Sequence, residues 1–241
     1  MRTLCIIPAR GGSKGIPGKN HKPLLGKPLI QYSIETALGI FPKEQICVST
    51  DSPEIIEIAT RLGVAPPFVR PAHLATDTSG SREVLLHALD YYNNECKIKN
   101  QPLFDSIVLL QATSPLRKPQ DVINCMELYQ STDCDMVVSV CESPFNPYYN
   151  IFIENQSGFI RRSIESNYTR RQDCPQAYII NGSIYVINAE VLQKQAMHEM
   201  QRIAKMVQPW EMMIDLDTPE DWKELEFKMQ SGFYNNLINA Q

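Results

Sequence analysis

Hydrophobic residues in the first 140 positions follow two alternating patterns. Short runs that are apolar at nearly every position predict buried strands, and longer stretches with apolar residues three or four apart predict helices. The predicted strands are residues 4–7, 45–48, 106–110 and 136–140, and the predicted helices are residues 29–38, 53–62, 81–92 and 121–129. Fully apolar strands separated by helices predict an α/β fold, in which helices cover both faces of a mostly parallel sheet.

This pattern breaks in residues 142–176, which hold prolines, an aromatic cluster and several arginines. Alternation in residues 149–153 and 158–160 predicts two short antiparallel strands around a turn at residues 155–158. Such a hairpin cannot bury its own aromatic side chains, so we expect it to pack against another surface, most simply a second subunit. We interpret residues 1–241 as a single domain that contains an inserted β-rich dimerisation arm, residues 142–176.

The first predicted strand runs into a loop that is rich in glycine and positive charge. Glycines let the backbone turn sharply and bring its N–H groups close to a ligand, and cations supply attraction for an anion. The loop contains Arg10, Gly11, Gly12, Lys14, Gly15, Gly18 and Lys19. In Rossmann-like sheets, ligands collect at the carboxyl ends of the strands, so the loop predicts a polyphosphate site.

The loop matches neither of the two common phosphate-binding motifs. A Walker loop requires Ser or Thr after Gly-Lys, but Asn20 follows Lys19. A dinucleotide-binding loop runs straight into a helix, which Pro17 and Pro23 prevent. The alternative is a solvated surface loop, although this many cations and glycines oppose self-packing without a counter-anion.

Polar residues also follow the other predicted strands. Gln111 comes directly after an apolar run and before a Ser-Pro turn, so we expect it to project into the crevice. Asp51 precedes Ser52 and Pro53, which is also typical of a helix start, and a purely structural role stays open. A hydroxyl-rich segment, residues 69–81, precedes the third predicted helix. We expect one of its serines to cap that helix, and Arg82 to lie on the helix surface.

The last third of the chain offers a candidate metal site. Residues 212–217 predict a strand from which Asp215 and Asp217 project on the same face. Two converging carboxylates suit Mg²⁺, which fills its remaining positions with phosphate oxygens and water. Asp217 also begins a Thr-Pro-Glu helix start, so a capping role is its alternative. A terminal helix is expected from Pro219 to about Phe227.

Composition limits the possible functions. The net charge of −4 gives no indication of nucleic-acid or membrane binding. No stretch approaches the roughly 18 apolar residues of a membrane-spanning helix, and the first apolar run is too short for a signal peptide. The seven cysteines form no C-x-x-C pair, which indicates a reducing cytoplasm. The four histidines have no partner nucleophile, so a hydrolase triad is unsupported.

Four segments resemble the acylneuraminate cytidylyltransferases, the enzymes that make CMP-activated sialic acids. They are P-A-R-G-G-S-K-G followed by Lys19-Asn20, L-L-Q-x-T-S-P-L-R at residues 109–117, R-R-Q-D with N-G-x-[IF]-Y at residues 170–185, and D-x-D-T-P at residues 215–219. The resemblance implies CTP and a nonulosonic acid as substrates, Mg²⁺ as cofactor, a role in cell-surface glycans such as lipopolysaccharide, and a homodimer or tetramer.

The resemblance also assigns residues to roles. Arginine suits the carboxylate of a sugar acid because its planar guanidinium binds both oxygens, with Arg171 as first candidate and Arg170 as second. The full set is: catalytic Arg10, Lys19, Arg170 and Arg171; nucleotide-binding Ala9, Arg10, Gly11, Gly12, Ser13, Asn20, Arg70, Ser79, Ser81 and Gln111; sugar-binding Arg171, Gln172, Tyr178 and Asn181; metal-binding Asp215 and Asp217.

One departure from the family concerns the acceptor. Sialic-acid members often carry an arginine where this chain has Ile179 and Ile180, so a less hydroxylated acid such as legionaminic or pseudaminic acid is expected. The alternatives are a cytidylyltransferase for Kdo, a catalytically silent nucleotide-binding member, and a nicotinamide oxidoreductase, which fits the sheet but not the loop.

Overall fold

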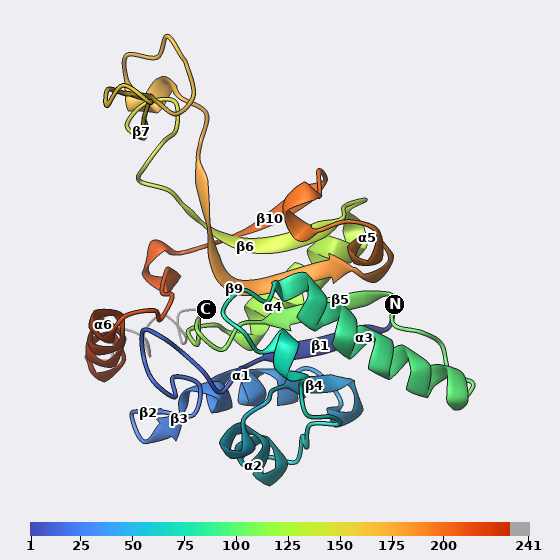
Figure 1. The fold of residues 1–241 in the computed structure, drawn as a ribbon. Helices are drawn as coiled ribbons and strands as arrows, with labels where there is room; N and C mark the ends of the chain where they lie inside the picture. Colours follow the sequence, from blue (N-terminus) through green and yellow to red (C-terminus); the bar gives the residue numbers. More distant parts are fainter. Residues whose placement is uncertain (232–241) are drawn as a thin grey trace.

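The computed structural model describes residues 1–231 and is built on one mixed six-stranded sheet (Figure 1). The strand order is β10-β6-β9-β5-β1-β4. Five strands run in the same direction, and β9 is antiparallel to both of its neighbours, β5 and β6. The strands are β1 Thr3–Pro8, β4 Ile46–Ser49, β5 Ser106–Leu110, β6 Met136–Glu142, β9 Tyr178–Asn188 and β10 Ile203–Gln208. The prediction of a mostly parallel sheet is confirmed, and β9 and β10 are additions to it.

Helices cover both faces of the sheet. They are α1 Leu29–Leu38, α2 Pro53–Arg61, α3 Ser81–Ile98, α4 Pro119–Ser131, α5 Ala189–Lys194 and α6 Pro219–Gln230. The predicted start of α2 is confirmed, because Ser52 Oγ accepts a hydrogen bond from the Ile55 amide and Pro53 occupies the first turn. No described helix is long and apolar enough to span a bilayer.

The predicted serine cap of α3 is wrong. Its N-cap is Gly80, which has no side chain to cap the helix. The Ser79 hydroxyl instead forms hydrogen bonds with the Thr76 amide and the His73 carbonyl inside the preceding turn. Arg82 lies on α3 as predicted, and it is half-buried. Its guanidinium donates to the carbonyls of Leu192 at 2.9 Å and Gln193 at 2.7 Å, and so neutralises the carboxyl end of α5.

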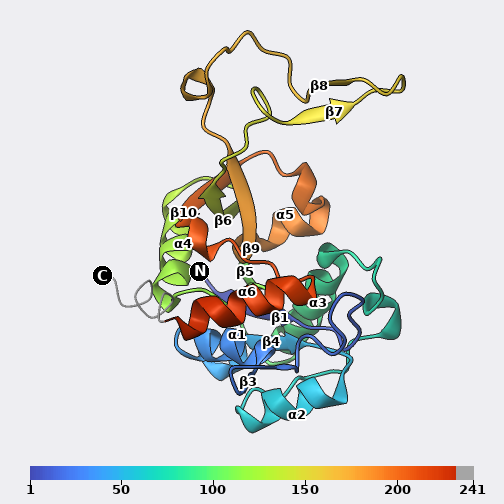
Figure 2. The same cartoon turned by 90° about the vertical axis from the view of Figure 1, so that its left-hand side faces the viewer.

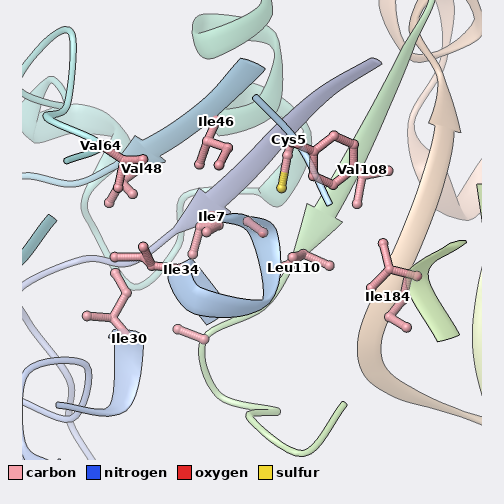
Figure 3. Close-up of a cluster of buried hydrophobic side chains, with 14 of the residues drawn as sticks. Cys5, Ile7, Ile30, Ile34, Ile46, Val48, Val64, Val108, Leu110 and Ile184 are labelled. Atoms are coloured by element: carbon pink, nitrogen blue, oxygen red, sulfur yellow. The ribbon is translucent and has the colours of Figure 1, made fainter. Parts of the chain in front are cut away.

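Two hydrophobic clusters fill the space between the sheet and its helices. Successive residues of a strand point to opposite faces, so Ile7 shares a cluster with residues of α1, α2 and α4, whereas Ile6 shares one with residues of α3 and α5 on the other face. Figure 3 shows Ile7 together with Ile30 and Ile34 of α1. This two-sided burial explains why β1 is apolar at every position from Leu4 to Ile7. It also fixes where the loop after β1 leaves the sheet.

A third cluster joins the two ends of the chain. Ile16 from the glycine-rich loop packs with Leu29, with Ile214 and Leu216, and with Trp222 of α6. The apolar positions of the loop and of the C-terminal segment therefore lie in one core, which places their polar positions side by side.

The predicted strand at residues 212–217 is wrong. Trp210–Met212 is a turn of 3-10 helix, and residues 213–217 belong to no helix or strand. The alternation that suggested a strand is nevertheless real. Met212, Ile214 and Leu216 are buried in the third cluster, and the intervening side chains are more exposed. Side-chain packing, rather than a hydrogen-bonded ladder, holds this segment.

The predicted hairpin is confirmed, with its boundaries one to three residues further along the chain. The strands are β7 Phe152–Glu154 and β8 Ile160–Arg162, and Gly158 in the connecting turn has a φ of 81°. Figures 1 and 2 show the hairpin projecting from the body on two long connections. Its apolar side chains are largely uncovered, with Phe159 73% and Ile160 67% exposed.

Candidate active site

Residues 9–20, between β1 and the third core cluster, form a loop that the end of β4 holds in place. The Gly11 amide donates to Asp51 Oδ1 at 2.8 Å, and the Ala9 amide donates to the Ser49 carbonyl at 2.9 Å. Across the loop, Asn20 Nδ2 donates to the Arg10 carbonyl at 3.0 Å. Asp51 thus has the structural role that its sequence context left open, as an anchor for the loop backbone.

The loop forms one wall of a cavity of about 530 Å³. The other walls come from residues 70–84, from the turn after β5 and from the segment that carries Asp215 and Asp217. The predicted site residues that line it are Arg10, Gly12, Ser13, Lys19, Asn20, Arg70, Ser79, Ser81, Gln111, Asp215 and Asp217. Segments from both ends of the described chain therefore meet at the carboxyl end of the sheet, where parallel strands place their ligands.

The glycine-rich loop touches the acidic segment directly. Lys19 is 7% exposed, and its ammonium lies 3.1 Å from Asp217 Oδ1 and donates to the Leu216 carbonyl. Gly15 lies so close that a Cβ added there would be 1.9 Å from the Asp217 carbonyl oxygen. Only glycine permits this approach, which fixes the distance between the loop and the carboxylates.

The charge of Asp217 disturbs the Asp215 carboxylate. Although part of the Asp215 side chain faces solvent, loss of water around its carboxyl group raises its pKa, and the nearby charge of Asp217 raises it further, while a hydrogen bond from Thr113 partly offsets the shift. A cation bound between them would relieve this strain. Among residues 1–231 no group of three or more histidine, cysteine or acidic side chains is arranged around a common metal position. The donor set is therefore one or two carboxylates, which suits a hard cation that takes its other ligands from phosphate and water.

Asp77, which the sequence did not single out, pairs with two loop cations. Its carboxylate oxygens lie 2.7 Å from the Arg10 guanidinium and 2.8 Å from the Lys14 ammonium. Arg10 also donates to the Thr76 carbonyl at 2.7 Å. The hydrogen bond from Lys14, together with the charges of Lys14 and Arg10, holds the pKa of Asp77 below its usual range.

At the other end of the cavity, Arg70 is buried and anchored to the end of β4. Its Nε donates to Ser49 Oγ at 3.0 Å, and its terminal nitrogen donates to the Ser49 carbonyl. Burial lowers its pKa to about 10, so the guanidinium remains charged at neutral pH. Asn20 Oδ1 is buried without a hydrogen-bond partner among the described residues, which leaves it available to a donor on a ligand.

Several predicted residues lie away from this cavity, at the base of the hairpin. Arg170 forms a bidentate pair with Asp173 at 2.8 and 2.9 Å. Arg171 and Gln172 line a separate cavity of about 230 Å³, and Arg171 also lines one of about 620 Å³ beside Trp210. Tyr178 is stacked under the ammonium of Lys205, 4.7 Å from the ring centre. Within one chain, these side chains do not line the cavity that contains Arg10 and Lys19.

Asn181 is buried in a hydrogen-bond network inside the sheet. Ser139 Oγ donates to its Oδ1 at 2.7 Å, and its Nδ2 donates to Gln208 Oε1 at 2.6 Å. The register of β6 and β9 shifts here, and Gly182 adopts a φ of 71°. The glycine, rather than the asparagine, approaches the cavity, because a Cβ on Gly182 would lie 2.8 Å from Gln111 Oε1. The hydrogen bonds of Asn181 thus link β9 to β6 and β10, which is a structural role.

Two further predicted residues support the cavity from behind. Ala9 is buried in the core cluster that contains Ile7. Gly11 lies on the outer side of the loop, where an added Cβ would be 3.0 Å from that of Ser52. Conversely, the cavity contains Asp77 and Thr113, which sequence reasoning missed. Thr113 lies two positions after Gln111 in the same turn, which could have marked it, whereas Asp77 had no comparable signal.

Comparisons with known proteins agree with this geometry. The family model described as Cytidylyltransferase matches residues 4–237. The CMP-N,N'-diacetyllegionaminic acid synthase of Legionella pneumophila is 34% identical over 95% of this chain and 97% of its own length. The pseudaminic acid cytidylyltransferase of Campylobacter jejuni is 34% identical, with 94% of both chains covered. An N-acylneuraminate cytidylyltransferase of Streptococcus agalactiae is 36% identical over 92% of this chain, which spans 52% of that protein.

A solved structure of CMP:2-keto-3-deoxy-manno-octonic acid synthetase complexed with CTP has the same fold. Its TM-score is 0.68 at 20% identity, over 96% of this chain and 99% of that one. At this identity the likeness concerns the fold alone.

Proposed function

The chain belongs to the cytidylyltransferase family, and on that premise we propose that it transfers CMP from CTP to the anomeric hydroxyl of a nonulosonic acid, with release of pyrophosphate. The observation that carries the proposal is the single cavity in which the loop cations face the two carboxylates. The names of three relatives with different nonulosonic acceptors support the acceptor class.

The cavity suggests an orientation for CTP. Arg10, Lys14 and Lys19 lie along the glycine-rich loop and would receive the phosphates. Arg70, which is anchored to the end of β4, and Gln111, which follows β5, line the cavity and would meet the cytidine through a guanidinium and an amide. Ser81 at the start of α3 contributes a hydroxyl to the same region.

Asp215 and Asp217 would hold Mg²⁺. Their carboxylates line the nucleotide cavity, and the charge of Asp217 contributes to the raised pKa of Asp215, so the donor set fits a divalent cation that also binds phosphate. When bound, Mg²⁺ would neutralise phosphate charge and orient the reacting groups.

The chain's own residues would act mainly by position and charge. In the proposed reaction the sugar hydroxyl forms a bond to the α-phosphorus in line with the bond to the β-phosphate, which breaks and leaves as pyrophosphate. Arg10 and Lys19 would stabilise the negative charge that builds up on the leaving group. Gly15 would hold the loop and the acidic segment at the separation that this arrangement needs.

We place the acceptor among the less hydroxylated nonulosonic acids, such as legionaminic or pseudaminic acid. The support is the apolar pair Ile179 and Ile180 and the relatives that use these acids. A Kdo acceptor is not favoured, since the Kdo synthetase likeness concerns only the fold. A catalytically silent protein is not favoured because Arg10, Lys19 and the two aspartates share the cavity.

We further propose that the protein is a homodimer in the cytoplasm. The projecting hairpin exposes Phe152, Phe159 and Ile160, which a second subunit would cover. Arg171 lies at the base of that hairpin and could then face the cavity of the partner subunit. The cysteines of the described chain form no disulfide, and six are buried, which suits a reducing compartment.

Pyrophosphate release tests the proposed function. The purified chain is incubated with each of CTP, UTP, ATP and GTP, with Mg²⁺ or with a chelator, and with N-acetylneuraminate, legionaminic acid, pseudaminic acid or Kdo. We expect release only with CTP, Mg²⁺ and a nonulosonic acid. Release with Kdo but no nonulosonic acid, or with another nucleotide in preference to CTP, would overturn the proposal.

A further inference from the structure

We propose that Asp77 is an internal competitor for pyrophosphate: it neutralises Arg10 and Lys14 in the ligand-free site, yields them to the triphosphate, and takes them back as pyrophosphate leaves. This inference rests on the proposed function and adds to it a residue that controls how tightly the phosphates are held.

The first support is the arrangement of charges. Each carboxylate oxygen of Asp77 is committed to one cation, with 2.7 Å to the Arg10 guanidinium and 2.8 Å to the Lys14 ammonium. A second guanidinium nitrogen of Arg10 donates to the Thr76 carbonyl. Both cations are thus occupied by the segment opposite, although both line the cavity that would receive the phosphates.

Oxygen atoms of a phosphate would need the same donors. Guanidinium and ammonium groups bind carboxylates and phosphates with similar geometry, so one ligand must replace the other. Asp77 carries one negative charge, whereas a triphosphate or pyrophosphate carries several. The polyphosphate therefore displaces Asp77 from Arg10 and Lys14 while it is bound. Asp77 pairs with both cations again when the polyphosphate leaves.

The turn that carries Asp77 is held mainly by bonds within itself. Ser79 Oγ donates to the His73 carbonyl at 3.0 Å and accepts from the Thr76 amide at 3.1 Å. A further bond of 2.8 Å joins the hydroxyls of Thr76 and Ser79. Figure 2 shows this turn, before α3, beside the loop that follows β1. The exchange can consequently move the turn away from the loop without breaking its internal bonds.

The pairs are partly exposed, which makes them suitable for exchange. The Asp77 and Arg10 side chains are 39% and 32% exposed, and Lys14 is 84% exposed. Ion pairs of this kind are weak in water. Apparent affinity falls in proportion to the fraction of molecules whose cations are free, so we expect Asp77 to weaken polyphosphate binding by roughly three- to tenfold.

The effect should depend on which phosphates a ligand carries. Pyrophosphate and CTP would use Arg10 and Lys14 and must displace Asp77. CMP would lie nearer Arg70 and Gln111 and would leave the Asp77 pairs intact. A selective effect on pyrophosphate distinguishes competition from a general loosening of the loop.

Calorimetric titration of the full chain with pyrophosphate, CTP and CMP, in the presence of Mg²⁺, tests the proposal. We expect Asp77→Asn to bind pyrophosphate roughly three- to tenfold more tightly than the unmodified protein, with little change for CMP. In turnover assays the same variant should show stronger inhibition by added pyrophosphate and a lower KM for CTP. Asp77→Glu, which keeps the charge, should restore weaker pyrophosphate binding.

Asp90→Asn is the matched control, because it removes the same charge from an exposed position on α3 outside the cavity. It should leave all three affinities unchanged. Unchanged or weaker pyrophosphate binding in Asp77→Asn, or equal tightening in Asp90→Asn, would overturn the role of Asp77. Failure of the unmodified protein to bind CTP and pyrophosphate would overturn the proposed function as well.

Discussion

Lys19 and Asp217 form an ion pair across the candidate active site, with 3.1 Å between Nζ and Oδ1, although 198 positions separate them in the sequence. Lys19 is buried and also donates to the Leu216 carbonyl. This lysine therefore has two functions in our account, since it positions the acidic segment and supplies charge for the leaving phosphates.

Removing Lys19 should abolish most activity. Lys19→Ala loses both the charge and the link to Leu216, so we expect pyrophosphate release with CTP to fall about a hundredfold or more. Lys223→Ala, an exposed change on α6 close to the same segment, is the control and should be nearly neutral. Near-normal turnover in Lys19→Ala would contradict this role.

Gly15→Ala should disrupt the junction between the loop and the acidic segment. The added methyl group would lie 1.9 Å from the Asp217 carbonyl oxygen, so the backbone must shift, at about 1–3 kcal/mol of unfolding free energy. Gly12→Ala is the matched control in the same loop, where no atom lies within 4 Å of an added Cβ, and should change stability by less than about 0.5 kcal/mol. Chemical denaturation of both variants measures the difference, and equal stabilities would refute the close approach.

Asp215 should make stability depend on pH. Its pKa is raised in the folded protein, by burial first and by Asp217 next, so the folded state holds its proton more tightly than the unfolded state does. The free energy of unfolding must then fall as pH rises from the ordinary aspartate range through the raised pKa. Asp215→Asn has no carboxyl group to ionise at this position, so its free energy of unfolding should not fall in this way.

Without Mg²⁺, Asp215→Asn should therefore melt at a higher temperature than the unmodified protein at neutral pH, and the difference should shrink at acidic pH. Added Mg²⁺ should raise the melting temperature of the unmodified protein and leave the variant unchanged. A variant that melts lower at neutral pH would show that the carboxylate is not destabilised by its surroundings.

Asn181 provides a test between structural and sugar-binding roles. Asn181→Ala removes the bond from Ser139 and leaves Gln208 Oε1 without its donor inside the sheet, so we expect a loss of about 1–3 kcal/mol of unfolding free energy. Activity of the folded fraction should keep its KM for the sugar acid. A raised KM with unchanged stability would instead support the assignment to sugar binding that the sequence suggested.

The hairpin should control the oligomeric state. Phe159→Asp places a charge on a side chain that is 73% exposed in one chain, so folding of the chain should survive while dimerisation is lost. Light scattering should give the mass of a dimer for the unmodified protein and of a monomer for the variant. Glu154→Gln, an exposed polar change in β7, is the control. Identical masses for the unmodified protein and Phe159→Asp would remove the hairpin from the interface.

Local patterns were enough to predict the elements that position the phosphate side of the site. β1, β4 and β5 are apolar at nearly every position because they are buried on both faces, and parallel strands end at one edge, so the loop after β1 and Gln111 had to lie close together. The alternation in residues 212–217 correctly placed Asp215 and Asp217 on one side. It could not reveal that packing on Trp222, rather than a neighbouring strand, holds that segment.

Features that depend on distant partners could not be predicted. Asn181 resembled a ligand-binding residue, but its partners Ser139 and Gln208 lie on β6 and β10, and only the folded sheet brings them together. Asp77 forms an ion pair with Arg10, which lies 67 positions earlier in the sequence. The hydrophobic periodicity does not predict this contact because both residues lie in loops. The sequence pattern of one chain likewise does not encode where Arg171 would lie relative to a second subunit.

The most direct test of the central claim is Mg²⁺-dependent release of pyrophosphate from CTP by Asp215→Ala, measured with the best sugar acid for the unmodified protein. Our account predicts a variant with the same circular dichroism spectrum and no measurable Mg²⁺-dependent release. Undiminished turnover in that variant would show that the acidic segment beside the glycine-rich loop is not the metal-binding part of the active site.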